Sequence, residues 1–464
     1  MKTKIKQMFF QLKEELNIST DAKKIVLQSL PILFCMFLSI FCKWFIIGAL
    51  IFALIPIAMN NSGKGLYFVF LLLPLVSIFK LNVKSFYLLP IVVGALIAVL
   101  GIKLVIKLFK KETKLNIPLT IFFGIFVAYL LLQFNFSNIT TFCSLLLGLA
   151  LLYVIWYYKE DISFKELIFI FALGMLASVL IGLFRPINGR LQDLVDRFTA
   201  FGLLRFSACA QNVNVFAGEL AILLSGFSFL YMKKQINIFF WLVYTTTFLI
   251  LTFTISKSAL LIFLFITVCL IIYSIVQDKK KCYKTILTIL CCWVIVFAFN
   301  AFRTYTILFR LFNNDVTSKS GITNLTTGRT DIWMVYFDYI FSNFKTLMFG
   351  YGISAKDVGA WSTLQDCSSH NTLIQMWYYI GIVGVGLFFC LLCSYIGWKK
   401  VFKLNLPIIA IIASVFMFLM GLDFFSYRIS NYFLIIYFAY NSNSIEKEQK
   451  EVSIVLGEGV GHGE

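Results

Sequence analysis

The sequence predicts an all-α, polytopic integral membrane protein with about 12 to 14 transmembrane helices and one large outer loop. Its hydrophobic fraction is 60%, its charged fraction is 13% and its mean hydropathy is +0.89. A soluble domain carries roughly 25% charged residues. Apolar runs of about 16 to 24 residues recur along the chain, and each is long enough to cross a hydrocarbon core of ~30 Å as a helix.

Fourteen apolar runs, taken in chain order, are the predicted spans. They cover residues 26–42, 44–59, 66–80, 86–106, 117–133, 139–157, 166–184, 213–231, 237–254, 258–276, 285–302, 372–396, 406–421 and 424–440. Before them lies a charged arm, in which Met8, Phe9, Leu12 and Leu16 are spaced as on one face of a helix. This arm is either solvated or an amphipathic helix at the membrane surface.

Lysine clusters predict the orientation of the spans. The clusters "KTKIK", "KLFKKETK", "MKKQ", "QDKKKCYK" and "GWKKVFK" fall on one side, which is cytoplasmic because basic loops stay inside. The protein is then predicted to lie in the cytoplasmic (inner) membrane, with both termini on the cytoplasmic side. The predicted segments are a cytoplasmic N-terminal arm (1–25), transmembrane helices (26–302), a large extracytoplasmic loop (303–371), transmembrane helices (372–440) and a cytoplasmic tail (441–464). The net charge of +18 reflects this topology, and no aromatic-interleaved basic face indicates nucleic-acid binding.

The arginines gather on the other side. There are eight against 32 lysines, namely Arg185, Arg190, Arg197, Arg205, Arg303, Arg310, Arg329 and Arg428, and on the predicted topology all face outward. A guanidinium is a planar, permanently charged fork that binds phosphate through two hydrogen bonds. An outward group of arginines therefore favours an anion site near the membrane surface. Lipid headgroup binding, or scattered salt bridges within the loops, is the alternative.

Four short patterns lie on the predicted outer face. They are "RFSACAQNVN" with Arg205, Asn212 and Asn214, "TISKSALL" with Lys257, "TTGRTDIW" with Arg329, and "FGYG" followed by "SSHNTL" with His370 and Asn371. In this order on a many-spanning chain, they resemble the O-antigen polymerase and O-antigen ligase family of bacterial membrane glycosyltransferases, over roughly residues 197–395. The chain departs from the family in having Val213 where proline is frequent. It also has Lys257 where arginine is frequent, which keeps the charge but loses the fork.

The resemblance implies a polysaccharide polymerase. It would transfer a growing glycan from undecaprenyl pyrophosphate onto a lipid-linked repeat unit at the outer face of the membrane, with no metal or cofactor. A ligase that moves the finished glycan to another acceptor would use the same donor, and the residues do not separate the two. Implied partners are the lipid-linked oligosaccharide, membrane lipids, a chain-length regulator and a flippase. Outside the family, the chain itself could be a flippase or a non-catalytic scaffold, although the nearly charge-free spans argue against a flippase.

The candidate residues divide into those that stabilise charge and those that remove a proton. Candidates for pyrophosphate binding are Arg205, Arg303, Arg310 and Arg329. Candidate substrate-binding or structural residues are Asn212, Asn214, Lys257 and Asn371. His370, the one histidine in the membrane domain, is the candidate base because neutral imidazole accepts a proton near pH 7. Glu219 is the rival base, since acids inside a membrane span are rare and usually face a cavity.

Overall fold

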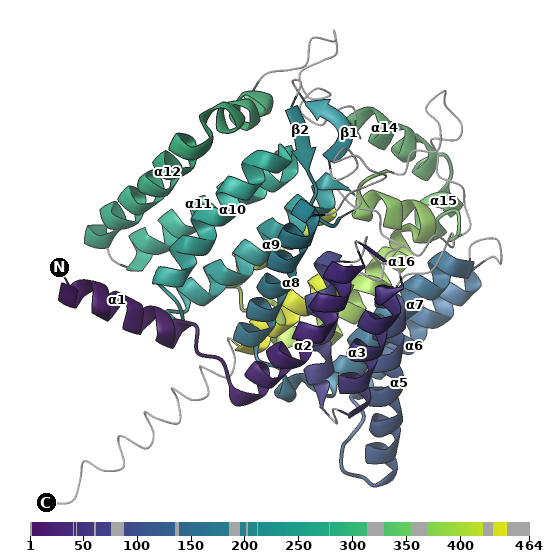
Figure 1. Ribbon diagram of the computed structural model, residues 1–464. Helices are drawn as coiled ribbons and strands as arrows, with labels where there is room; N and C mark the ends of the chain where they lie inside the picture. The colour runs from purple at the N-terminus through teal and green to yellow at the C-terminus, as the bar shows by residue number, and fades with distance from the viewer. Residues whose placement is uncertain are drawn as a thin grey trace, which may run out of the picture.

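The structure, a computed structural model, describes residues 2–39, 41–42, 44–59, 62–75, 88–134, 139–184, 195–200, 203–210, 212–277, 279–312, 329–353, 369–420 and 430–442. In these ranges the chain is helical apart from one pair of short strands (Figure 1). Six of the described helices are long and apolar enough to cross a membrane, and six shorter apolar helices accompany them. The all-α membrane fold predicted from composition is thus confirmed.

The N-terminal part of the bundle is a series of antiparallel helices. Its elements are α1 (Lys2–Glu15), α2 (Thr20–Leu38), α3 (Phe45–Met59), η1 (Gly63–Gly65), α4 (Leu66–Leu72), α5 (Leu88–Phe109), α6 (Ile117–Leu132), α7 (Ile139–Trp156), η4 (Lys159–Asp161) and α8 (Phe164–Phe184). The Ser19 side chain caps α2 by accepting from the Ala22 N–H, so this helix begins six residues before the predicted start at 26. The Asn116 side chain caps α6 in the same way.

The C-terminal part holds the family-like patterns. Its elements are β1 (Val195–Ala200), β2 (Leu203–Phe206), α9 (Val213–Met232), α10 (Ile238–Thr254), α11 (Lys257–Gln277), α12 (Lys279–Phe312), α14 (Arg329–Ile340), α15 (Phe344–Phe349), α16 (Thr372–Ile396), α17 (Trp398–Val401), α18 (Leu406–Leu419) and a helix over 430–442. The two strands pair antiparallel, in a stretch for which no strand was predicted. Helix α12 runs ten residues past the predicted end of its span at 302.

Helix α4 is buried on every side. All seven of its side chains, from Leu66 to Leu72, are fully enclosed by protein. It packs so closely on α8 that a Cβ on Gly174 would lie 2.2 Å from the Leu71 carbonyl oxygen, which leaves glycine as the residue that fits. A helix too short to cross the bilayer is tolerated here because its backbone groups face protein and not lipid.

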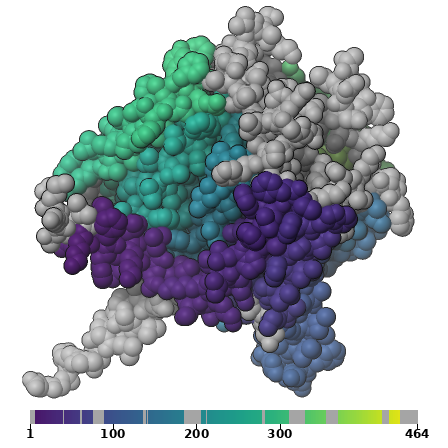
Figure 2. Space-filling model, in the orientation of Figure 1, coloured from purple at the N-terminus to yellow at the C-terminus, as the bar shows by residue number. Residues whose placement is uncertain are grey.

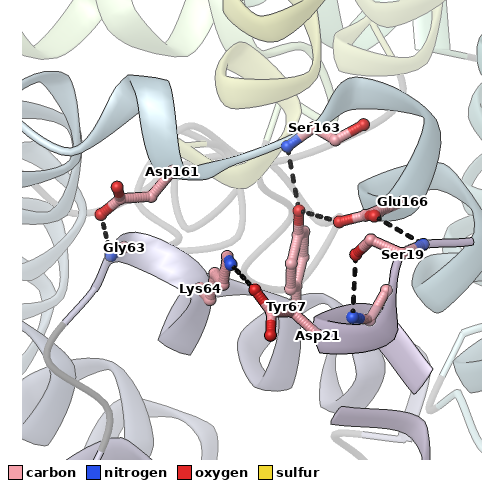
Figure 3. A network of polar contacts seen from close by, with 9 residues as sticks. Ser19, Asp21, Gly63, Lys64, Tyr67, Asp161, Ser163 and Glu166 are labelled. Carbon is pink, nitrogen blue, oxygen red and sulfur yellow. Dashed lines mark hydrogen bonds and ion pairs between the residues drawn. The ribbon is translucent and has the colours of Figure 1, made fainter. Parts of the chain in front are cut away.

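A polar network ties α4 to the starts of α2 and α8 (Figure 3). The buried Tyr67 hydroxyl donates to Glu166 Oε2 at 2.9 Å and accepts from the Ser163 N–H at 2.9 Å. The other oxygen of Glu166 accepts from the Ser19 N–H at 3.2 Å. Two contacts flank this centre, from the Gly63 N–H to Asp161 (2.8 Å) and between Lys64 and Asp21. Each group finds a partner from another helix, so the network fixes the packing of the N-terminal helices.

Helix α1 forms the arm that precedes the bundle. Figure 2 shows it along the lower left edge of the molecule. Its last residue, Glu15, accepts hydrogen bonds from the Ile238 and Phe239 N–H groups in the first turn of α10, at 3.1 and 2.8 Å. Met8 and Phe9 are exposed. The arm is therefore a helix anchored at one end, and its position at a membrane surface stays a prediction.

Candidate functional site

Arg205 is the centre of the first polar cluster. It lies in β2 and is 6% exposed. Its Nε donates to the Thr254 carbonyl at 2.9 Å, and one terminal nitrogen donates to Asn214 Oδ1 at 3.1 Å. Asn214 is itself positioned by the α9 N-cap, because its N–H donates to the Asn212 side chain at 2.8 Å. The arginine and the Asn-Val-Asn pair of the first pattern are thus brought together.

The turn between α10 and α11 closes the same cluster. Ile255 ends α10 in the left-handed conformation with φ 50°, and α11 begins two residues later at Lys257. Between them, the buried Ser256 hydroxyl donates to Asn214 Oδ1 at 3.0 Å. The Asn214 oxygen therefore accepts from both Arg205 and Ser256. Lys257, half-buried, starts a helix beside this junction, so the pattern "TISKSALL" forms a tight turn between two helices.

Arg303 reaches the same end of α10 from α12. Asn300 interrupts the α12 helix with φ −150° and ψ 54°, and its side-chain amide donates to the Thr252 hydroxyl at 3.1 Å. Past this kink, the Arg303 guanidinium lies 4.9 Å from the ring centroid of Phe253, a cation–π contact. We call Arg205, Asn214, Thr254, Ser256 and Arg303 the arginine corner.

Arg310 continues the same α12 segment, and only its backbone is described. Its helical position shows that α12 extends as far as this arginine, and the side of the membrane on which it lies stays a prediction. Arg197 is likewise described by backbone alone, in β1. The predicted outer residues Arg185, Arg190 and Arg428 lie outside the described ranges.

The second cluster surrounds His370, at the start of α16. His370 has φ 47°, a left-handed conformation that is uncommon for a residue with a Cβ. Its neighbour Asn371 caps α16 by accepting from the Leu373 and Ile374 N–H groups at 3.0 and 3.3 Å. Its other neighbour, Ser369, is fully buried and donates its hydroxyl to the Asn371 carbonyl at 2.9 Å. The half-buried imidazole is thus held in a fixed turn, which we call the His370 turn (Ser369–Asn371).

Helix α14 packs on the His370 turn. Its first residue, Arg329, is half-buried, and one turn later Trp333 donates from its indole to the Ser369 carbonyl at 2.9 Å. Tyr336 lies edge-on against Tyr378 of α16, with centroids 5.1 Å apart. The third and fourth patterns are therefore adjacent in space.

Helix α16 is broken below the His370 turn. Gly381 has φ 63° and ψ −179°, a conformation open to glycine and hardly any other residue. The break frees backbone carbonyls, which receive new donors: the Tyr378 carbonyl from the Tyr351 N–H at 2.9 Å, and the Ile380 carbonyl from the Tyr129 hydroxyl at 2.6 Å. The Gly352 N–H bonds the Tyr379 carbonyl at 2.9 Å. The backbone of the "FGYG" segment at the end of α15 therefore hydrogen-bonds to the break in α16, a contact that we call the α15 dock. The sequence analysis did not predict this role.

Glu219 lies deeper than either cluster. It is six residues past the start of α9, about 9 Å along the helix axis. Its side chain is 1% exposed, and its Oε1 accepts from the Tyr432 hydroxyl at 2.8 Å. This contact joins α9 to the helix over 430–442.

The two clusters lie at one end of the molecule. In Figure 1 the β1–β2 pair and α14 both stand at the upper end, where α9, α11 and α16 also begin. Six of the predicted residues with described side chains lie in one of the two clusters. Four belong to the arginine corner or to the helix cap beside it, and two belong to the His370 turn. The six are Arg205, Asn212, Asn214, Arg303, His370 and Asn371. Lys257 and Arg329 begin the adjoining helices.

Comparison with known protein families gives a match, and it covers most of the elements at this end of the molecule. Residues 240–389 match the family described as O-Antigen ligase. Through this segment the chain is similar to the O-antigen polymerase and ligase family, as its sequence patterns predicted. The match contains Lys257, Arg303, Arg310, Arg329, His370 and Asn371. Arg205, Asn212, Asn214 and Glu219 precede it. No curated protein matches the chain.

This similarity points to the broad activity. It indicates a function of O-antigen ligase or polymerase type, a glycosyltransferase class whose family acts on lipid-linked oligosaccharides. The apolar helices confirm the predicted membrane protein, and the family match agrees with the predicted glycosyltransferase type.

Proposed function

We propose that the protein is a polysaccharide polymerase. It transfers a growing glycan from undecaprenyl pyrophosphate onto a lipid-linked repeat unit, at the outer face of the cytoplasmic membrane with both termini inside. The observation that carries this proposal is the arginine corner, in which residues of two separate patterns meet Arg303 of α12 at one end of the bundle. A pyrophosphate at headgroup depth needs several cationic donors at one place.

The arginines take different parts in binding the pyrophosphate. Arg205 is buried and oriented by Thr254 and Asn214, so it contributes a fixed positive charge to the corner. Arg303 and Arg329 are half-buried and supply forks that contact phosphate oxygens. Arg310 extends the same group along α12. Because the leaving group is already an acidic anion, these charges stabilise it as the glycosidic bond breaks, without a metal ion.

The reaction forms one bond and breaks one. An acceptor hydroxyl on the repeat unit attacks the anomeric carbon of the donor glycan. The bond from that carbon to the pyrophosphate oxygen breaks, undecaprenyl pyrophosphate leaves with the electron pair, and the hydroxyl proton passes to a base. His370 is that base, because its imidazole is half-buried in a fixed turn at the helix start.

Glu219 is the weaker candidate for the base. Its carboxylate is 1% exposed and already accepts a hydrogen bond from Tyr432. A base that removes a proton from a sugar hydroxyl must come within hydrogen-bond distance of it. The depth of Glu219 therefore favours a role in joining α9 to the last helix.

A second candidate function is a ligase. The description of the matched family, O-Antigen ligase, favours it directly. The same donor and the same arginine corner serve both reactions, and only the acceptor differs. A chain-length regulator and a flippase are proposed partners of the polymerase.

The test is the surface glycan of a deletion strain. A polymerase predicts single repeat units in place of a ladder on a gel, whereas a ligase predicts long chains that stay on the carrier. Complementation with His370→Ala should fail at wild-type protein levels, while Glu219→Gln should restore the ladder. Arg303→Gln should weaken it, and the matched control Lys233→Gln, which removes a cation over Phe229 at the far end of α9, should not. Full rescue by His370→Ala would overturn the assignment of the base.

A further inference from the structure

A polar pocket lies at the opposite end of the bundle from the arginine corner. It has a volume of about 410 Å³ and is lined by Tyr231, Lys234, Ile236, Asn237, Tyr273, Ser274, Gln277 and Thr285. Its walls are the turn between α9 and α10 and the facing ends of α11 and α12. Helix α9 separates it from the arginine corner by about 30 Å, the length of its 20 residues. It therefore takes no part in the proposed transfer reaction.

The geometry points to a binding site for a phosphate anion, which we propose is the headgroup of an anionic lipid. Lys234 supplies the charge. It occupies the left-handed residue that ends α9, with φ 60°, which directs the chain around the pocket. In the described part of the chain, its ammonium group has no hydrogen-bond or ion-pair partner. An exposed cation at a pocket wall is a point charge that suits a phosphate oxygen.

Two side-chain amides add donors. Asn237 stands at the N-cap of α10, and its side chain makes no capping bond there. Glu15 of α1 takes over the cap by accepting from the Ile238 and Phe239 N–H groups. The Asn237 amide is thus available on the pocket wall, opposite Gln277 at the end of α11. A cation with two amides is a donor set for an oxyanion.

The other polar groups on the wall are already committed. The Tyr273 hydroxyl donates to the Met232 carbonyl at 2.5 Å, and Ser274 donates to Thr285 at 2.8 Å. These bonds stiffen the wall without competing for a ligand. Donors for an anion therefore come from Lys234, Asn237 and Gln277.

The surroundings favour a lipid as the source of the phosphate. Next to the pocket, Ile272 and Val276 of α11 and Leu287 of α12 are exposed, at 43%, 76% and 58%. These apolar side chains offer a surface for acyl chains beside a polar pocket for the headgroup. The lysine clusters predict that this end is cytoplasmic, and basic pockets on that side of membrane proteins bind anionic headgroups.

The experiment uses the full-length protein in phosphatidylcholine nanodiscs with increasing phosphatidylglycerol, and measures lipid binding by native mass spectrometry and thermal melting. Lys234→Gln should weaken phosphatidylglycerol binding about tenfold or more, the loss expected for a charge-assisted bond. Gln277→Glu should weaken it further by repulsion. The control Lys111→Gln changes another exposed lysine in the left-handed conformation, with φ 58°, and should bind as wild type does.

A further measurement distinguishes the two possible sources of the phosphate group, a lipid headgroup and a soluble phosphate ester. Glycerol phosphate added to pure phosphatidylcholine discs should not raise the melting temperature. If it does so in wild type and not in Lys234→Gln, the phosphate site stands but the lipid source is overturned. Equal phosphatidylglycerol binding by wild type, Lys234→Gln and Gln277→Glu would overturn the site itself. None of these readouts depends on glycan synthesis.

Discussion

Replacing Gly381 by alanine should unfold the protein at a markedly lower temperature. Two costs add at this position. Alanine must adopt φ 63° and ψ −179°, a region that costs about 1–3 kcal/mol for a residue with a Cβ. The new methyl would also lie 2.3 Å from the Met348 carbonyl oxygen and 2.4 Å from the Phe349 nitrogen, and such overpacking costs about 1–3 kcal/mol. The sum of about 2–6 kcal/mol is a large part of the 5–15 kcal/mol that stabilises a typical domain.

The matched control for Gly381→Ala lies five residues along in the same helix. A Cβ on Gly386 would meet nothing within 4 Å, and the helix continues there without a break. Gly386→Ala should therefore stabilise the protein slightly, by up to about 1 kcal/mol of helix propensity. The measurement is thermal unfolding of both variants in the same detergent, with expression level as a second readout. Equal melting temperatures for the two variants would refute the conclusion that α15 docks into a broken α16.

Three further predictions concern single contacts. Tyr129→Phe removes the hydroxyl that donates to the broken helix and should lower the free energy of unfolding by about 0.6–1.7 kcal/mol. Glycan synthesis should fall by more than the amount of folded protein does. Asn371→Ala and Asn405→Ala each remove an N-cap and should lower the free energy of unfolding by about 0.5–2 kcal/mol in melting experiments. Only Asn371→Ala should also impair the glycan ladder, because Asn371 adjoins the proposed base. The Lys64 ammonium, by its hydrogen bond and charge, holds the pKa of Asp21 below its usual value. That stabilisation is present above the unfolded-state pKa and disappears as the pH falls through the folded-state pKa, so the melting curves of wild type and Lys64→Ala should converge in acid.

Apolar run lengths predicted most helices because a span needs about 20 apolar residues whatever it packs against. The predicted span at 372–396 coincides with α16, and that at 213–231 differs from α9 by one residue. The break inside α16 was not predictable in this way. Gly381 stands in a run that reads as an ordinary helix, and its conformation depends on the α15 backbone at Met348 and Phe349, 33 and 32 residues earlier.

The sequence predicted which residues belong to the candidate site, but it did not predict which of them are in contact. Arg205 and Asn214 are nine residues apart, so their proximity follows from a short turn into α9. Arg205 and Thr254 are 49 residues apart, and only the packing of β2 on α10 brings the guanidinium to that carbonyl. Ser256 donates to Asn214 across a similar separation. Sequence spacing carries no information on such pairs, whereas the helix caps Asn212 and Asn371 were readable as residues that begin helices.

The arginine corner and the His370 turn are positioned by different elements, so their contributions should be separable. The arginine corner is built from β2, α9, α10 and α12, and the contacts described above join these elements to one another. The His370 turn rests on α14 and on the short upper segment of α16, which in turn depends on Tyr129 and the α15 dock. A substitution at the dock therefore moves the proposed base while the arginine corner, which supplies Arg205 and Arg303 to the pyrophosphate, stays intact. For Tyr129→Phe this means that lipid-linked donor should still bind the purified protein with wild-type affinity while transfer slows, a separation that a general loss of folding cannot produce.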